Sequence, residues 1–492
     1  GFGIISRACG ESADMAAKGS VRAGVWLLLD TLSAAIVAFA FFVFSARVLS
    51  PLEFGIATLV VSISQILIPL IESLFHDAVI QREDLTAEDT ETAVTTSFLW
   101  AATLAAILWF AAPGLAAFTN TPEVADFLPW LVPALLASGA AAVPAALARR
   151  KMNFRSLALR TIFARLTATG IAVAMLVEGH GAEAVVLQAV LSVSIAAVLL
   201  LFMEPVPLRP RIVRSSLISM LRFAGAAVGA QFLLFASGRL VTLIVANMLG
   251  TVAAGTWNVA LRLVEPFHVM TATLIGQYMV PLFSRNQADL QRIKELYLQA
   301  TRLSCVVTVP MFIGLGLCAK QMILLFVGEE WLAAEQPMVV ICLGFAVIAS
   351  RQLIENALTS LGRPELNLGI QATAIVISVI GFIYGARYGL LEGVIGWSLR
   401  VLPFVLLGSF FLRWKAGVSI FAQVGALLPT ITAVTVMSAG VLYVQRYLDG
   451  IPSSKLLAIS VSVGVLLTAL TVLTTDPGLR KMAFGAMRLR RS

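Results

Sequence analysis

Charged residues are scarce in this sequence. Asp, Glu, Lys and Arg make up only 13% of the 492 residues, whereas an average soluble domain carries about 25%. The 3 His are scattered, and the 4 Cys (Cys9, Cys305, Cys318 and Cys342) lack C-x-x-C spacing, so we expect no disulfide framework and no metal. Hydrophobic residues reach 59% and the mean hydropathy is +0.92. This composition predicts an integral membrane protein.

Motifs for catalysis and nucleotide binding are also missing. The sequence has no P-loop, no G-x-S-x-G, no H-E-x-x-H and no paired-carboxylate motif. Every predicted loop is short, which argues against a membrane glycosyltransferase, polymerase or ligase. We therefore predict a protein that is not an enzyme and has no cofactor. Its energy source would be an H⁺ or Na⁺ gradient, or consumption of the cargo on the far side.

Apolar runs of about 20 residues, the length that a helix needs to cross a membrane, occur about fourteen times. The predicted fold is an all-α membrane protein with about 14 transmembrane helices. The first run has no A-x-A-like cleavage site, which favours a retained helix. "MAAKGSVRAG" from Met15 looks like a natural start, so residues 1–14 are given no role. The runs begin near Val25, Phe54, Val94, Phe127, Leu159, Ala184, Leu217, Thr256, Leu303, Gln336, Leu366, Leu391, Ile420 and Leu456.

Basic residues are distributed unevenly between alternate loops. With a cytoplasmic N-terminus, about 23 Lys and Arg fall in inside loops and 5 in outside loops, as the positive-inside rule expects. We predict that both termini are cytoplasmic. The charge therefore marks topology and gives no reason to expect nucleic acid as a partner. Segment 284–302 predicts an amphipathic helix at the membrane surface.

A weak repeat at an offset of 200 residues aligns "VLSPLEFGIATLVV" with "MLGTVAAGTWNVAL", so that Gly55 matches Gly255. Chance similarity between two hydrophobic segments is the alternative. The repeat predicts two pseudo-symmetric lobes around a central cavity. The predicted segments are a cytoplasmic start 1–20, an N-terminal lobe 21–203, a linker 204–216, a C-terminal lobe 217–412, two further helices in 413–475 and a basic tail 476–492.

Seven arginines remain within or at the edge of the apolar runs. A charge at the bilayer centre costs at least about 2.5–3.5 kcal/mol, so several of these residues must face protein or a wet cavity. Arginine suits phosphate, because it is always protonated and its planar fork binds two oxygens. We interpret the set as a ladder of cations for an anionic cargo. Its members are Arg160, Arg165, Arg222, Arg239, Arg262, Arg351 and Arg400.

Structural roles stay open for several of these arginines. Arg222 and Arg160 can extend to the membrane surface. Arg351 with Glu355 (i,i+4) and Arg262 with Glu265 (i,i+3) can form pairs within one helix. Three arginines have no carboxylate within helical reach, which favours cargo contact or interhelical pairing: Arg165, Arg239 and Arg400.

Acidic residues in apolar segments give a second signal. Asp30, Glu72 and Glu265 lie in such surroundings, which disfavour the ionised form and allow a group to carry a proton or bind Na⁺. Pro266 follows Glu265 and should kink the helix and free a carbonyl. His268 is a further candidate for coupling or gating, although a packed, neutral histidine is the alternative.

Five segments stand out by their order and spacing: "LSPLEFGIATLVVSISQI", "VIQREDLTAEDTETAVTTSF", "YMVPLFSRNQADLQRI", "LLFVGEEWLAAEQPMVVI" and "SLGRPELNL". Together they resemble the polysaccharide transporter family of the multidrug/oligosaccharidyl-lipid/polysaccharide flippase superfamily. The resemblance covers about residues 20–475 and implies a MATE-like arrangement of the two lobes. It implies a flippase of the bacterial inner membrane that carries an undecaprenyl-diphosphate-linked oligosaccharide repeat unit to the periplasmic leaflet. The implied partners are this lipid-linked oligosaccharide, a polysaccharide polymerase or co-polymerase, and membrane lipids.

The second of these segments favours exopolysaccharide or capsule export over lipopolysaccharide O-antigen. Two other functions within the superfamily remain open, namely a cation-coupled drug exporter and a lipid II flippase. A drug exporter for cationic compounds should have an acidic cavity, which the excess of arginine disfavours. A non-transporting scaffold of polysaccharide synthesis is an alternative of a different class.

Overall fold

The computed structural model describes Trp26 and residues 29–82, 84–206, 209–287, 289–448 and 450–475, and the side chains of 222–237 are not among those described. The predicted segments 1–20 and 476–492, with Cys9 and Met15, lie outside these ranges. All regular elements in the described part are helices. Thirteen of them are long and apolar enough to cross a membrane, so the all-α membrane fold is confirmed.

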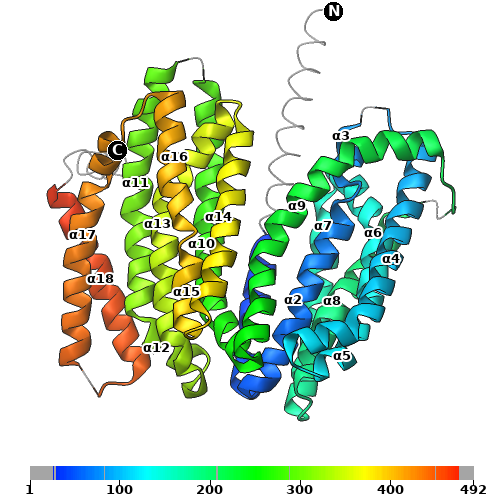
Figure 1. Ribbon diagram of the computed structural model, residues 1–492, viewed down its shortest axis with the longest axis horizontal. Helices are drawn as coiled ribbons and strands as arrows, with labels where there is room; N and C mark the ends of the chain where they lie inside the picture. Colours follow the sequence, from blue (N-terminus) through cyan, green and yellow to red (C-terminus); the bar gives the residue numbers. More distant parts are fainter. Residues whose placement is uncertain are drawn as a thin grey trace, which may run out of the picture. The chain divides into compact units, whose positions relative to one another are not determined.

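The chain divides into two compact units, Gly1–Gly255 and Thr256–Ser492 (Figure 1). The first unit begins with a membrane helix at Leu29–Val48. Its further helices are α2 (Pro51–Ser73), α3 (His76–Gln81), α4 (Ala87–Thr119), α5 (Glu123–Phe127), the 3-10 helix η1 (Leu128–Leu131), α6 (Val132–Arg150), α7 (Phe154–Val177), α8 (Ala182–Met203) and α9 (Arg214–Leu249).

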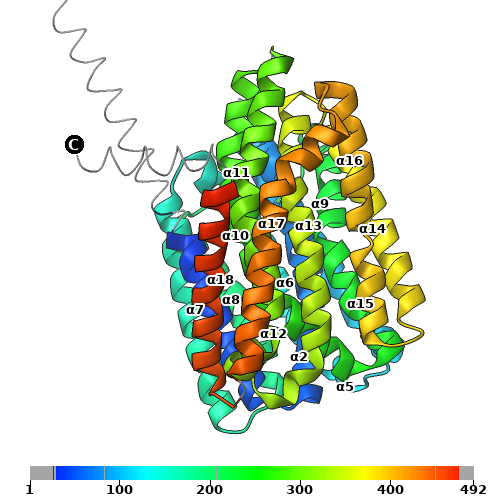
Figure 2. The same cartoon turned by 90° about the vertical axis from the view of Figure 1, so that its left-hand side faces the viewer.

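The second unit packs α11 against α13 and α17, and α14 against α15. Figures 1 and 2 both show α17 and α18 side by side. Its helices are α10 (Thr251–Arg285), α11 (Leu290–Leu317), α12 (Ala319–Phe326), the 3-10 helix η2 (Glu329–Ala334), α13 (Glu335–Ser360), α14 (Pro364–Gly385), α15 (Leu390–Ser398), α16 (Val401–Ala416), α17 (Ile420–Tyr447) and α18 (Ser453–Thr475).

The predicted membrane runs correspond to these helices in order, and α9, a 36-residue helix, accounts for the run near Leu217. The prediction of a separate surface helix within 284–302 is wrong. Residues from Leu290 onward are the first turns of the membrane helix α11. Ile293 and Tyr297 are fully buried against residues of α13. Apolar contacts therefore continue α11 beyond its most hydrophobic part.

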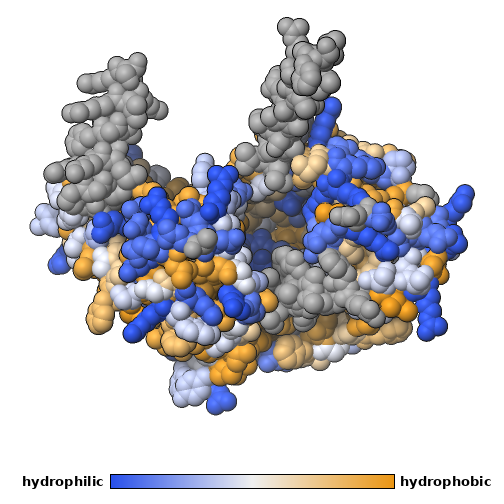
Figure 3. All heavy atoms as spheres, turned by 90° about the horizontal axis from the view of Figure 1, so that it is seen from above, coloured by the Kyte–Doolittle hydropathy of each residue, from blue (hydrophilic) through white to orange (hydrophobic). Residues whose placement is uncertain are grey.

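In unit 1, the loops that join α3 to α4, α6 to α7 and α8 to α9 lie at one end of the helices, which we term the basic face. Arg82, Arg149, Arg150, Lys151 and Arg211 lie there in unit 1. Figure 3 views the molecule from above, on this side, and hydrophilic residues gather over the helix ends. Five basic residues thus gather at one end of unit 1, and the assignment of this end to the cytoplasm stays a prediction.

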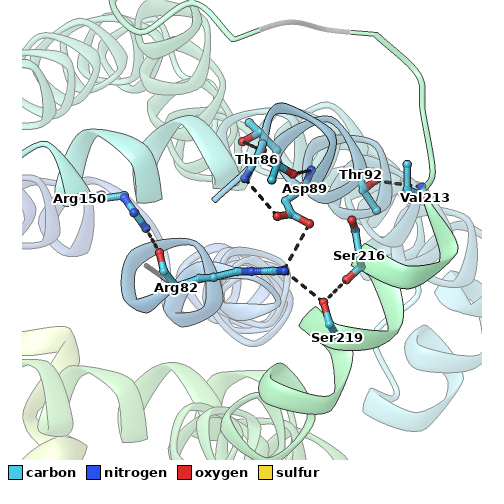
Figure 4. A network of polar contacts seen from close by, with 9 residues as sticks. Arg82, Thr86, Asp89, Thr92, Arg150, Val213, Ser216 and Ser219 are labelled. Carbon is cyan, nitrogen blue, oxygen red and sulfur yellow. Dashed lines mark hydrogen bonds and ion pairs between the residues drawn. The ribbon is translucent and has the colours of Figure 1, made fainter. Parts of the chain in front are cut away.

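Helix α9 is anchored to unit 1 at the basic face through Asp89 (Figure 4). The Asp89 side chain is almost fully buried and accepts from the backbone N–H of Thr86 at 3.1 Å, which caps α4. Its other oxygen lies 3.3 Å from the guanidinium of Arg82. Arg82 also donates to Ser219 of α9 at 3.2 Å.

The segment before α9 is fastened to α4 as well. The Val213 N–H donates to Thr92 at 3.1 Å, and Arg211 pairs with Glu88 at 2.8 Å. The sequence analysis assigned 204–216 to a linker and the following helix to the second lobe. In the structure α9 packs on α2 and α4 instead, so the division between units falls at Gly255.

Glycines allow unusually close helix contacts in both units. A Cβ atom on Gly396 would lie 2.0 Å from the carbonyl oxygen of Gly381, and one on Gly385 would lie 2.1 Å from that of Glu392. The backbones of α14 and α15 therefore touch, as small residues permit in membrane helices. At the start of α10, a Cβ on Gly255 would lie 3.4 Å from Cα of Gly55. The two glycines matched by the sequence repeat are thus in contact.

Alanine at Gly381 should destabilise the protein strongly, because its Cβ would lie 2.3 Å from the carbonyl oxygen of Gly396. We expect a loss of about 1–3 kcal/mol, as for other overpacked sites, measured as a lower thermal midpoint in detergent. Gly369→Ala on the same helix is the matched control, since a Cβ there meets no atom within 4 Å. Equal effects of the two changes would contradict the close α14–α15 contact.

Asp89→Ala should lower the free energy of unfolding by about 2 kcal/mol, because α4 loses a cap and Arg82 loses a buried partner. Asp89→Asn should have a smaller effect, since an amide oxygen can still accept from Thr86. Asp84→Ala, at an exposed site two residues before Thr86, is the control. Thermal unfolding of the purified variants measures the difference, and equal midpoints for all three would argue against this anchor.

Candidate functional site

A pocket of about 310 Å³ lies within unit 1, among the first membrane helix, α6 and α7. Leu157, Arg160, Thr161 and Arg165 share one face of α7, because side chains three to four residues apart in a helix are neighbours. Arg149, near the end of α6, adds a third guanidinium. The complete lining is Asp30, Thr31, Ala34, Arg149, Phe154, Leu157, Arg160, Thr161 and Arg165.

The pocket brings together three of the predicted site residues: Asp30, Arg160 and Arg165. Arg165 donates to the carbonyl oxygen of Ala34 at 3.3 Å, which holds α7 to the first membrane helix. Its charge and that of Arg160 act on the Asp30 carboxylate. One oxygen of Asp30 and the Nε of Arg160 are nevertheless buried without a hydrogen-bond partner in the described structure. The pocket therefore holds polar groups that are not fully satisfied by the protein.

Glu72 of α2 belongs to the same electrostatic neighbourhood, although it is not among the lining residues. The charges that act on it are those of Arg160, Arg149 and His76. Arg149 is itself hydrogen-bonded to Nε2 of His76. Three arginines thus face two carboxylates in this part of unit 1, which leaves an excess of positive charge.

A second cluster lies within unit 2 and joins three further predicted residues: Glu265, His268 and Arg400. The guanidinium carbon of Arg400 lies 3.5 Å from the ring centroid of Trp397 and 5.3 Å from that of Phe345. The carboxylate of Glu265, on α10, acts on Arg400 electrostatically. The His268 ring stacks on Phe345, with centroids 4.4 Å apart and planes inclined by 12°.

The histidine is packed, as one of the two interpretations of the sequence expected. Its Nδ1 is buried and has no hydrogen-bond partner among the described residues. Helix α10 continues through Pro266, so the proline does not end it. The carbonyl of Arg262, four residues earlier, cannot receive a bond from Pro266, which has no N–H. The kink and the coupling role stay predictions.

Arg351 lies elsewhere. It is almost fully buried in α13 and donates to Oε1 of Gln423 in α17 at 3.1 Å. The predicted i,i+4 pair with Glu355 is absent from the ion pairs of the described residues, because the guanidinium turns to the neighbouring helix instead. This environment is interhelical packing, which is the structural role that the sequence analysis left open.

The remaining arginines are spread over other helices. Arg239 in α9 and Arg262 in α10 are half-buried, and the side chain of Arg222 lies outside the described residues. The predicted ladder therefore occupies several distinct environments, of which the unit 1 pocket and the Arg400 cluster contain the most predicted residues.

Sequence reasoning missed three contributors. Arg149 was counted only as a loop charge, although it ends the helix that precedes α7. Trp397 stands three residues before Arg400, and this i,i+3 spacing was a usable signal. Phe345 comes from α13, and no local pattern could have linked it to Arg400.

Comparisons with known proteins give one family match and several relatives of low sequence identity. A family model described as "Polysaccharide biosynthesis protein" matches residues 44–336. The succinoglycan biosynthesis transport protein ExoT of Rhizobium meliloti (strain 1021) is 23% identical over 457 residues, covering 91% of each chain. A membrane protein of the cps region of Klebsiella pneumoniae is 22% identical over 403 residues, covering 80% of this chain and 82% of that protein.

Solved structures show the same fold at low sequence identity. A structure described as lipid II flippase MurJ in an inward closed conformation superposes with a TM-score of 0.74 at 13% identity, covering 92% of this chain and 99% of that one. An inward-facing multidrug resistance MATE transporter superposes with a TM-score of 0.62 at 14% identity, covering 80% and 98%. With its family match spanning more than half of its length, the chain belongs to the polysaccharide biosynthesis protein family, and it has the same fold as these two solved structures.

Proposed function

We propose that this protein is a flippase that moves an undecaprenyl-diphosphate-linked oligosaccharide repeat unit across the bacterial inner membrane. The observation that carries the proposal is the pocket of unit 1, where Arg149, Arg160 and Arg165 line one cavity within a bundle of membrane helices. Guanidinium groups bind phosphate oxygens in pairs. A membrane protein that keeps three of them in one pocket is suited to a strongly anionic headgroup.

Family membership and the names of the relatives support a cargo that contains sugar. One relative is named as a transport protein of succinoglycan biosynthesis, and a structure with the same fold is described as a lipid II flippase. The diphosphate is the part of a lipid-linked sugar that is hardest to move through hydrocarbon. We infer that the arginines bind this part and that the glycan occupies aqueous space beside them.

We infer the topology from the basic loop residues and the energy source from the acidic residues within the membrane helices. The basic face is assigned to the cytoplasm by the positive-inside rule, which puts both termini inside and directs transport to the periplasm. Alternating access between the two units would move the cargo, and H⁺ or Na⁺ exchange at Asp30, Glu72 or Glu265 could drive it. A polysaccharide polymerase or co-polymerase would use the product.

Arg160→Ala and Arg165→Ala should each weaken binding of undecaprenyl diphosphate by about tenfold or more, since a charge-assisted hydrogen bond contributes about 1.5–3 kcal/mol. In cells, export should fall and lipid-linked repeat units should accumulate. Arg155→Ala is the matched control, because Arg155 is exposed on the same helix and is not among the lining residues. Normal binding by the Arg160/Arg165 double variant would exclude this pocket as the diphosphate site.

Arg239→Ala, Arg262→Ala and Arg400→Ala test whether arginines outside this pocket also contact the cargo. We expect each variant to fold normally and to lose polysaccharide export, with lipid-linked intermediates retained inside the cell. Full export by all three would restrict the site to unit 1. If the protein is instead a scaffold without transport activity, the unmodified protein will show no flipping in proteoliposomes.

Glu265→Gln should slow transport and flatten its pH dependence in proteoliposomes, if this carboxylate exchanges a proton during the cycle. Arg400 and this carboxylate act on each other electrostatically, and Arg262 and His268 lie three residues to either side of it in α10. Glu178→Gln, at an exposed site after α7, controls for loss of an acid elsewhere. A variant with slower transport but an unchanged pH profile would assign Glu265 a structural role beside Arg400.

A further inference from the structure

Arg400 is held by two buried aromatic rings at an interruption between helices. The guanidinium carbon is 3.5 Å from the centroid of Trp397 and 5.3 Å from that of Phe345. Trp397 is 4% exposed and Phe345 is 5% exposed, whereas Arg400 is only half-buried. The rings therefore belong to the core of unit 2, and the guanidinium of Arg400 rests against them.

The two rings are fixed by further aromatic contacts. Trp257, which is fully buried, meets Trp397 edge to face with centroids 4.9 Å apart and planes inclined by 85°. Phe345 stacks on His268 and lies 5.8 Å from Phe312. These contacts leave neither ring free to turn away from Arg400.

The backbone beneath Arg400 is fixed as well. Gly396 packs directly on Gly381 of α14. The N–H of Leu399 donates to Gly396 at 3.2 Å, and the N–H of Arg400 donates to Trp397 at 3.3 Å, so the chain tightens into i→i−3 bonds. Pro403, which has no N–H, prevents an ordinary helical bond to Leu399. This tightened backbone between α15 and α16 brings the side chains of Trp397 and Arg400 into contact.

We propose that Trp397 and Phe345 are positioning residues that hold the Arg400 guanidinium ready for the diphosphate of the cargo, an inference that rests on the proposed function. Cation–π contact occupies the face of the guanidinium, while its five N–H donors point outward from the edge. In the described structure these donors make no hydrogen bond or ion pair, and Glu265 acts on the charge only at longer range. A donor group whose orientation is already set loses little entropy when it binds.

The proposal predicts that position 400 requires arginine rather than lysine. A lysine ammonium is a compact charge that cannot present two parallel N–H groups while one face rests on a ring. Arg400→Lys should therefore keep the charge and lose the fixed fork. Because Trp397 and Phe345 position Arg400, substitutions at Trp397 should change diphosphate binding only through Arg400.

The experiment uses the full-length protein in nanodiscs with undecaprenyl diphosphate as the probe. The variants are Trp397→Leu, Trp397→Phe, Arg400→Lys, Arg400→Ala and the double variant Trp397→Leu/Arg400→Ala. We expect Trp397→Leu to weaken the apparent affinity about tenfold and Trp397→Phe, which keeps a ring, to bind nearly as the unmodified protein does. In the Arg400→Ala background, Trp397→Leu should have no further effect.

Trp414→Leu is the matched control. Trp414 holds Lys415 at 3.7 Å in a similar cation–π pair, but it is exposed and lies near the far end of α16. This variant should bind the probe normally. Thermal unfolding of every variant separates lost positioning from lost folding, and Phe345→Leu gives an independent test if Trp397→Leu does not fold. A further loss of affinity from Trp397→Leu in the Arg400→Ala background would overturn the proposal.

A second measurement separates this inference from the proposed function. Phenylglyoxal modifies arginine, and mass spectrometry reports the extent at Arg400 without any ligand. We expect faster modification of Arg400 in Trp397→Leu than in Trp397→Phe, and equal modification would overturn the positioning role of Trp397. If the variants differ as expected but undecaprenyl diphosphate neither binds nor protects Arg400, the positioning role stands and the proposed cargo is wrong.

Discussion

Compensation of arginine charge within the membrane is the constraint on which this structure depends. A guanidinium cannot shed its proton in a protein, so each one placed among apolar helices needs acids, acceptors or polarisable rings nearby. The chain uses all three kinds of partner. Arg160 and Arg165 face Asp30 and Glu72, Arg351 bonds to Gln423, and Arg400 rests on Trp397.

These three kinds of partner differ in whether they leave the guanidinium able to bind a cargo. Arg351 is almost fully buried and bonded to a neutral amide of α17, so it serves the packing of unit 2. The pocket of unit 1 encloses a cavity lined by three arginines and a single carboxylate, that of Asp30. The face of the Arg400 guanidinium is covered by Trp397, and its N–H groups make no hydrogen bond within the described residues. The environment of each arginine, rather than its presence in an apolar run, separates structural residues from candidates for cargo binding.

Much of this was predictable from the sequence. Apolar run length predicted the membrane helices. The grouping of the site residues needed tertiary contacts, because Asp30 meets Arg165 across more than 130 positions of sequence and Phe345 meets Arg400 from another helix. The sequence analysis also assigned α9 to the second lobe, whereas it packs within unit 1. The N-terminal part of α9 is held by Arg82, which pairs with Asp89, and no periodic sequence pattern encodes these contacts.

The boundary between the units has a mechanical consequence. It falls between Gly255 and Thr256, inside the continuous helix α10, and not in a flexible loop. An α-helix resists bending unless a bond in its ladder is missing, and Pro266 removes one such bond about three turns further on. The covalent connection between the units is therefore helical, and the missing backbone bond falls within unit 2, beside the turn that carries Glu265 and His268.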